Sequence, residues 1–264
     1  MIIRTNSIQT TLDKLYNLLS TERKVYYARF GDGDTNIMSG TGRCIEHTAS
    51  PELQRELITA FSIDDSHYIR GVMVKEPIFD GYGLKTRNNS PDEMVAINFI
   101  SSVFGNKDEV VFDSHVLLTY IAVCEQEIMI DFLNKFIRPK KKLFIGSVPK
   151  DEIEKLVGKI DYYVEVPRER VSEEKVAAGI PVGAYYSIAE WWPKVLECVD
   201  DVELVIPTAG MAGRVTCGRL WHLNKNIHCI ELGSMVDAVV GKLSRSIWGR
   251  NNNIMKIQNL LRDV

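Results

Sequence analysis

The sequence predicts a single α/β domain over residues 1–264, with a Rossmann-like, mostly parallel β-sheet and helices on both faces. Short apolar runs rich in β-branched and aromatic residues alternate with segments of helical periodicity along the whole chain. A crossover between parallel strands needs a helix to return the chain, so this alternation favours a parallel sheet. No repeat or low-complexity linker divides the chain, and its 45% hydrophobic residues suffice for one substantial core.

The individual elements follow from apolar spacing and capping residues. Leucines at helical spacing predict an amphipathic helix over 11–19 that leads into the first strand. Ser50 as N-cap, with Pro51 at the first helical position, predicts a helix that ends near residue 61. Further helices are expected over 92–104, 116–124, 125–136, 149–157, 187–199 and 212–223, and strands over 25–30, 67–74, 109–113, 143–146, 162–166, 202–206 and 227–232. The polar segment 75–91, with its glycines and prolines, is expected to be a mobile lid.

Composition excludes several classes of protein. A formal net charge of −3 argues against a general nucleic-acid binder, which needs an excess of Lys and Arg. The five cysteines are scattered without a Cys-x-x-Cys pair, which is typical of reduced thiols in a cytoplasmic protein. The N-terminus lacks the apolar core of a signal peptide, and no stretch reaches the roughly 18 apolar residues of a membrane span. We therefore expect a cytoplasmic protein without a transmembrane segment.

The strand expected over 25–30 ends in a polar turn, Gly31-Asp32-Gly33-Asp34. The glycines permit a tight, left-handed turn that lets Asp32 and Asp34 point at one spot. Two carboxylates so close repel each other unless a divalent cation or a proton holds them, and oxygen ligands suit Mg²⁺ or Mn²⁺. The alternative is a simple surface turn, in which Gly and Asp are common for conformational reasons alone.

A second glycine-bearing turn, at Gly210 and Gly213, precedes the helix over 212–223. Its free N–H groups and the helix dipole would cradle phosphate, while tight strand-helix packing is the alternative explanation. Ligands of such sheets bind outside the carboxyl ends of the strands, where both turns and the pair Ser114 and His115 are expected. For His115 a capping or core role is the alternative. A metal beside a phosphate cradle implies a pyrophosphate ligand, which fits a nucleotide-sugar donor.

Residues 29 to 34 read Arg-Phe-Gly-Asp-Gly-Asp, which resembles the Arg-Phe-Gly-Asp-Gly-Glu signature of the GT-D fold bacterial glycosyltransferases, formerly a domain of unknown function. Residues 204–220 are similar to the family's second glycine-bearing strand and helix, and 230–237 resemble its closing Ile-Asp-Ile-Gly segment. The resemblance covers most of the chain in order. It implies a GT-D type fold and metal-dependent transfer of a sugar from a nucleotide-diphosphate donor, in first place a UDP-sugar, to a glycan, glycoprotein or lipid-linked acceptor.

The expected site combines this resemblance with the strand-end rule. Asp32 and Asp34 are expected to hold Mn²⁺ or Mg²⁺ and to take part in catalysis, although Asp34 stands where the family commonly has glutamate. Ser234 follows Gly233 where the family continues with histidine, so Asp237 is the nearest candidate for the base that activates the acceptor. Substrate contacts are expected from Arg29, Gly31, Gly33, Lys85, Ser114, His115, Gly210, Gly213, Arg214, Gly233, Ser234 and Arg245.

Two other functions stay open. A haloacid-dehalogenase-like phosphatase has a strand-end Asp-x-Asp, which residues 32–35 echo, but it also needs a later aspartate pair at a strand end, and Asp200 and Asp201 precede their strand. A non-catalytic nucleotide- or glycan-binding module would keep the glycines without needing a metal. The basic run over 138–142 permits peripheral contact with anionic lipid, although a solvated face is the commoner explanation.

Overall fold

The sheet has eight strands in the order β1-β4-β3-β2-β8-β7-β5-β6, and the α/β prediction is confirmed. The computed structural model describes residues 1–41, 49–74, 90–167, 178, 183–241 and 252–263. The strands are β1 (Ile2–Thr5), β2 (Tyr26–Phe30), β3 (Tyr68–Val72), β4 (Glu109–Ser114), β5 (Lys142–Gly146), β6 (Tyr162–Glu165), β7 (Leu204–Pro207) and β8 (His228–Ile230). Each strand pair in the described part of the chain is parallel.

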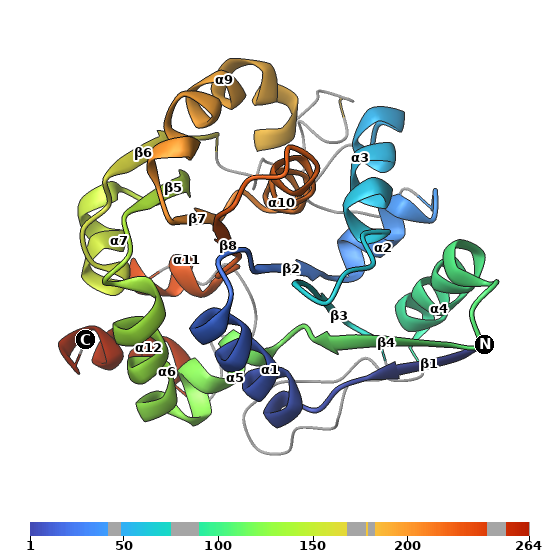
Figure 1. Cartoon of the computed structure of the whole chain (residues 1–264), viewed down its shortest axis with the longest axis horizontal. Coiled ribbons are helices and arrows are strands. Elements are labelled where there is room, and N and C mark those ends of the chain that lie inside the picture. The colour runs from blue at the N-terminus through green and yellow to red at the C-terminus, as the bar shows by residue number, and fades with distance from the viewer. Residues whose placement is uncertain (42–48, 75–89, 168–177, 179–182, 242–251, 264) are drawn as a thin grey trace.

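Helices cover both faces of the sheet, as Figure 1 shows. The first face packs against α2 (Asp32–Met38), α3 (Pro51–Phe61), α4 (Pro91–Phe104), α9 (Ile188–Cys198) and α10 (Met211–His222). The second face packs against α1 (Ile8–Thr21), α5 (Leu117–Cys124), α6 (Gln126–Phe132), the π-helix η1 (Leu133–Ile137), α7 (Lys150–Val157), α11 (Met235–Val239) and α12 (Asn253–Asp263). The 3₁₀ turns η2 (Ala184–Ser187) and η3 (Val199–Asp201) flank α9. Each face therefore has its own apolar core.

The central strand β2 shows how the sequence divides between the two cores. All five of its residues are buried. Tyr26, Ala28 and Phe30 belong to the first core and Tyr27 to the second, because successive side chains in a strand point to opposite faces. Burial on both faces produces the near-continuous apolar runs that marked the strands in the sequence.

The first strand, β1, was not predicted. It precedes α1 and pairs with β4 at one edge of the sheet, with Ile2 aligned to Glu109. Only Ile3 of its four residues is buried. Such a short edge strand leaves almost no alternation in the sequence, so the expectation that the helix over 11–19 led into the first strand was wrong.

The other predicted elements agree with the observed ones to within a few residues, whereas α11 was not predicted. The helix expected over 125–136 is divided between α6 and the π-helix η1. Most of the expected lid, residues 75–89, lies outside the described residues. Within the described ranges, no helix has the length and apolar character needed to cross a membrane.

Candidate functional site

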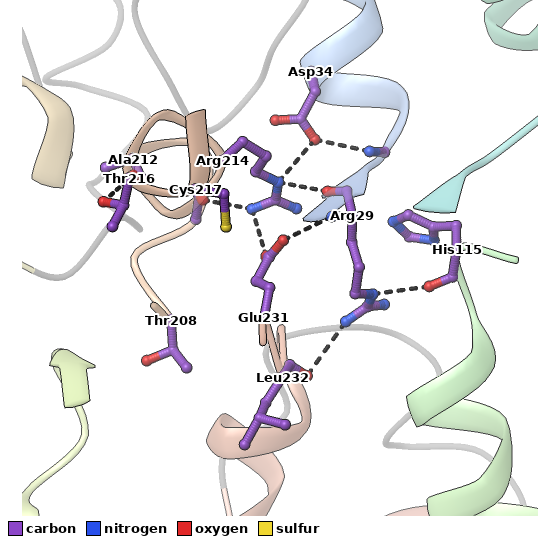
Figure 2. Close-up of polar contacts among 12 residues, drawn as sticks. Arg29, Asp34, His115, Thr208, Ala212, Arg214, Thr216, Cys217, Glu231 and Leu232 are labelled. Atoms are coloured by element: carbon purple, nitrogen blue, oxygen red, sulfur yellow. Dashed lines mark hydrogen bonds and ion pairs between the residues drawn. The ribbon is translucent and has the colours of Figure 1, made fainter. Parts of the chain in front are cut away.

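The adjacent strands β2 and β8 are followed by helices on opposite faces of the sheet. In open α/β sheets, ligands bind at such a position, outside the carboxyl ends of the strands. β2 continues into α2 on the first face, whereas β8 continues into α11 on the second face (Figure 1). Side chains from β2, α2, α10 and the link between β8 and α11 meet at this edge, as Figure 2 shows. The candidate site is therefore built from segments some 200 residues apart in sequence, as the pairing of Tyr27 with Ile230 shows.

Arg29 of β2 is a cation inside the protein, only 6% exposed. Its Nε donates to the carbonyl oxygen of His115 at 2.8 Å, and its Nη1 donates to that of Leu232 at 3.3 Å (Figure 2). Gly233 makes room for this guanidinium: its φ is +63°, and a Cβ there would lie 1.9 Å from Arg29 Nη1. Among the described residues, no carboxylate forms an ion pair with Arg29. The site thus contains a buried positive charge that is held by carbonyl groups.

Arg214 of α10 ties together the groups around Arg29. Its Nη1 pairs with Glu231 Oε1 at 2.9 Å, and its Nε lies 3.4 Å from Asp34 Oδ2. It also donates to the carbonyl oxygens of Arg29 and Gly210. Burial raises the pKa of Glu231, and the charge of Arg214 opposes this shift. Arg214 was expected to contact substrate, but these contacts direct its guanidinium toward the protein.

The turn at Gly31 to Asp34 differs from the predicted one. Gly31 is the N-cap of α2 with φ −88°, and Gly33 lies in the helix, so neither takes a left-handed conformation. Asp34 is buried, and its Oδ2 accepts the N–H of Gly31 at 2.8 Å. Asp32 is half-buried at the first helical position. Residues i and i+2 of a helix do not face each other, so Asp32 and Asp34 do not point at one spot as the sequence suggested.

A divalent cation at this edge would need an anionic ligand to complete its coordination. No group of three or more His, Cys, Asp or Glu side chains among the described residues could hold a metal by itself. Mg²⁺ is commonly held by one or two carboxylates together with substrate phosphates, and Asp32 at the end of β2 is placed for this role. Asp34 Oδ2 is engaged by Gly31 and Arg214, so Asp34 would have to offer its other oxygen.

His115 reaches the site from the end of β4. Its carbonyl oxygen holds Arg29, and its ring Nε2 lies 3.5 Å from the position that a Cβ on Gly31 would occupy. Ser114 is fully buried, and its carbonyl oxygen accepts the hydroxyl of Tyr27 at 2.8 Å. The structure thus brings His115 to Arg29 and Gly31, while a substrate contact by Ser114 or His115 stays a prediction.

The second glycine turn leads into α10. Gly210 is the N-cap with φ +53°, a conformation that favours glycine. A Cβ on Gly213 would lie 3.2 Å from the carbonyl oxygen of Pro207 in β7. Close packing of α10 on this strand therefore accounts for Gly213 without a ligand, and the phosphate cradle stays a prediction.

The other expected residues divide into two groups. Ser234 is the N-cap of α11, and Asp237 lies half-buried in the first turn of this helix, with its N–H donating to the carbonyl oxygen of Ser234 at 3.1 Å. Lys85 and Arg245 lie outside the described residues. Glu231 is the site residue that the sequence analysis missed. Its signals were an acidic side chain inside the apolar strand expected over 227–232 and its place at the acidic position of the Ile-Asp-Ile-Gly segment that residues 230–237 resemble.

Comparison with solved structures finds the same fold. A new glycosyltransferase (DUF1792) from Streptococcus sanguinis matches with a TM-score of 0.63 and 15% identity, over 95% of this chain and 85% of that one. A selenomethionine-substituted structure of the domain of unknown function 1792 matches with a TM-score of 0.59 and 14% identity, over 90% and 80% of the two chains. A structure of this domain described as a distinct glycosyltransferase fold matches with a TM-score of 0.57 and 14% identity, over the same 90% and 80%.

No protein-family model matches the sequence, and no curated protein matches it. The structural matches span most of both chains, and they agree with the fold that the resemblance to the GT-D family implies. The chain therefore has the GT-D glycosyltransferase fold of the DUF1792 structures.

Proposed function

We propose that this protein is a glycosyltransferase that moves a sugar from a nucleotide-diphosphate donor, in first place a UDP-sugar, to a glycan, glycoprotein or lipid-linked acceptor. The fold shared with glycosyltransferase structures supports the reaction class. The observation that supports the donor is Arg29, a buried guanidinium at the carboxyl edge of the sheet that is held by carbonyl oxygens and has no carboxylate partner among the described residues.

The surroundings of Arg29 favour an anionic ligand for an electrostatic reason. Removing a cation from water costs several kcal/mol even after the protein relaxes, and two carbonyl dipoles offset only part of this cost. Within the described chain, the Nη2 group of Arg29 donates to no acceptor. A phosphate oxygen would supply both the missing charge and the missing acceptor, and a guanidinium matches phosphate geometry well.

The charges around Arg29 also support a divalent cation. Asp34 and Glu231 share Arg214, and Asp32 adds a further carboxylate, so these three carboxylates outnumber the guanidinium groups of Arg29 and Arg214 by one. A donor diphosphate would add more negative charge. Mn²⁺ or Mg²⁺ held by Asp32 and the donor phosphates would neutralise the charge that builds on the departing diphosphate.

The side chains of the site have separate tasks in this proposal. Arg29 binds the diphosphate, and His115 and Leu232 keep the guanidinium in place through their carbonyl groups. The acceptor hydroxyl attacks the anomeric carbon as the bond to the diphosphate breaks. Asp237, half-buried at the start of α11, is our candidate for the base that takes the hydroxyl proton.

We also propose a cytoplasmic location, with peripheral membrane contact if the acceptor is lipid-linked. The basic run that precedes β5 adds no support for lipid binding. Lys140 and Lys141 pair with Glu203 and Asp201, and Lys142 is 1% exposed. The solvated-face explanation fits Lys140 and Lys141, whose charges are paired within the protein, whereas Lys142 is buried and donates to backbone carbonyl oxygens.

The phosphatase alternative loses support in the structure. Asp200 and Asp201 lie in η3 before β7, away from the carboxyl edge, where they pair with Lys225 and Lys141. The later aspartate pair that such a phosphatase needs is therefore not at the site. A non-catalytic binding module would use the same Arg29 contacts, so turnover must separate it from a transferase.

A screen of nucleotide sugars for release of nucleoside diphosphate, with and without Mn²⁺, tests the proposal. We expect metal-dependent turnover of at least one donor, and we expect Arg29→Met to weaken diphosphate binding about tenfold or more. Arg219→Met is the matched control, because Arg219 lies on α10 and pairs with Glu56 away from the carboxyl edge of the sheet. Diphosphate binding without turnover would indicate the binding module, and unchanged binding by Arg29→Met would refute the donor site.

A further inference from the structure

Glu231 is a charged residue in the interior for which the proposed reaction assigns no task. It follows β8 directly and is 1% exposed. Its Oε2 accepts the backbone N–H of Arg29 at 3.0 Å, and its Oε1 pairs with Arg214 Nη1 at 2.9 Å (Figure 2). A buried carboxylate is costly, so a hydrophobic residue would be expected here if the position served packing alone.

The end of the strand pair β2 and β8 explains why these side chains are needed. The ladder aligns Tyr27 with Ile230, and the N–H of Glu231 still donates to the carbonyl oxygen of Tyr27 at 3.1 Å. The chain then turns away at Gly233, so the backbone N–H and carbonyl groups of Arg29 find no ladder partner on this side.

Side chains replace this missing part of the ladder. Glu231 accepts the N–H of Arg29, Arg214 donates to the carbonyl oxygen of Arg29, and Glu231 and Arg214 pair with each other. The three residues form a closed ring that holds the backbone of Arg29 on both of its polar groups. The sheet can therefore open at this edge without leaving the buried backbone of Arg29 unsatisfied.

The same ring determines which charged groups of the site pair with each other. Arg214 and Asp34 belong to helices of the first face, whereas Arg29 shares the second face with Tyr27, two residues before it in the strand. Both buried carboxylates are directed to Arg214. The guanidinium of Arg29 is thereby left with carbonyl partners only, at a fixed place beside the carboxyl edge of the sheet.

We propose that Glu231 is a positioning residue that, through Arg214 and the backbone of Arg29, keeps the guanidinium of Arg29 available to the donor diphosphate. This inference rests on the proposed function, because it requires that Arg29 binds the diphosphate. Glu231 offers one carboxylate oxygen to the N–H of Arg29 and the other to Arg214, whereas a Gln at position 231 would place its NH2 group opposite one of these two donors, so the ring opens.

Isothermal titration with inorganic pyrophosphate and Mg²⁺ tests the inference on the full chain. We expect Glu231→Gln to raise the Kd about tenfold or more. Glu231→Asp keeps the charge but is shorter by one methylene, and we expect it to raise the Kd as well, which provides a second variant if Glu231→Gln does not fold. The matched control is Glu56→Gln, which removes another carboxylate paired with an arginine of α10 and should leave the Kd unchanged.

A double-mutant cycle distinguishes positioning from general destabilisation. If Glu231 acts through Arg29, then Glu231→Gln costs no further affinity in the Arg29→Met background, so the two effects on the Kd are not additive. Additive effects, or a Glu231→Gln protein that binds pyrophosphate like the wild type, would overturn the inference alone. A wild-type Kd for Arg29→Met would instead refute the proposed donor site, so the two failures are distinguishable.

Discussion

Gly233→Ala is the substitution for which the structure gives the clearest expected cost. The residue has φ +63°, where an alanine is strained by roughly 1–2 kcal/mol. The added Cβ would lie 1.9 Å from Nη1 and 3.0 Å from Cζ of Arg29, so the guanidinium must move. Moving Nη1 breaks its hydrogen bond to the carbonyl oxygen of Leu232, and a bond to a charged group is worth about 1.5–3 kcal/mol. We expect a loss of roughly 3–5 kcal/mol in the free energy of unfolding.

Urea unfolding together with pyrophosphate titration measures this effect. Gly158→Ala is the matched control, because Gly158 also has a positive φ, +75°, but its nearest neighbour is Arg138 Cβ at 3.4 Å. The control should lose only the strain energy and should keep the wild-type affinity. If both variants lose the same stability and both bind pyrophosphate normally, Arg29 does not occupy the space beside Gly233, and the reasoning about the site is wrong.

Three further predictions concern the metal, the packing and the pH dependence. Asp32→Asn should weaken Mn²⁺ binding in the presence of diphosphate about tenfold, as measured by electron paramagnetic resonance. Asp34→Asn should mainly lower the free energy of unfolding, by about 1 kcal/mol in urea titration, because its cap on α2 is lost. Gly218→Ala places a Cβ 2.6 Å from that of Ala60, so urea unfolding should show a loss of about 1–3 kcal/mol with unchanged pyrophosphate affinity. Burial lowers the pKa of His228 from 6.5 to about 4, so the folded state resists protonation of this side chain. The free energy of unfolding that is present above pH 6.5 should therefore fall by about 3 kcal/mol as the pH drops toward 4. This fall should be absent in His228→Asn.

The sequence alone determined the fold class and the edge of the sheet at which the candidate site is expected. Strands such as β2 and β3 are buried along their whole length, so their apolar runs are visible without any knowledge of their neighbours. The carboxyl ends of parallel strands share one edge, so Asp32 and His115 could be assigned to one region before their distance was known. These inferences rest on local periodicity and on a general rule of sheet geometry.

Only the tertiary structure decided which groups meet at that edge and in what direction they point. The pairing of β2 with β8 joins residues about 200 positions apart, and no local pattern specifies it. The start of α2 at Asp32, instead of a left-handed turn, separates the two aspartates that the motif suggested would converge. The sequence showed Glu231 as a charge in an apolar run and at the acidic position of a family segment, but it did not show the partners Arg29 and Arg214, which come from other segments. The periodicity of apolar residues in a helix or strand depends on neighbours along the chain. A buried ion pair depends on contacts that form only when distant segments pack together.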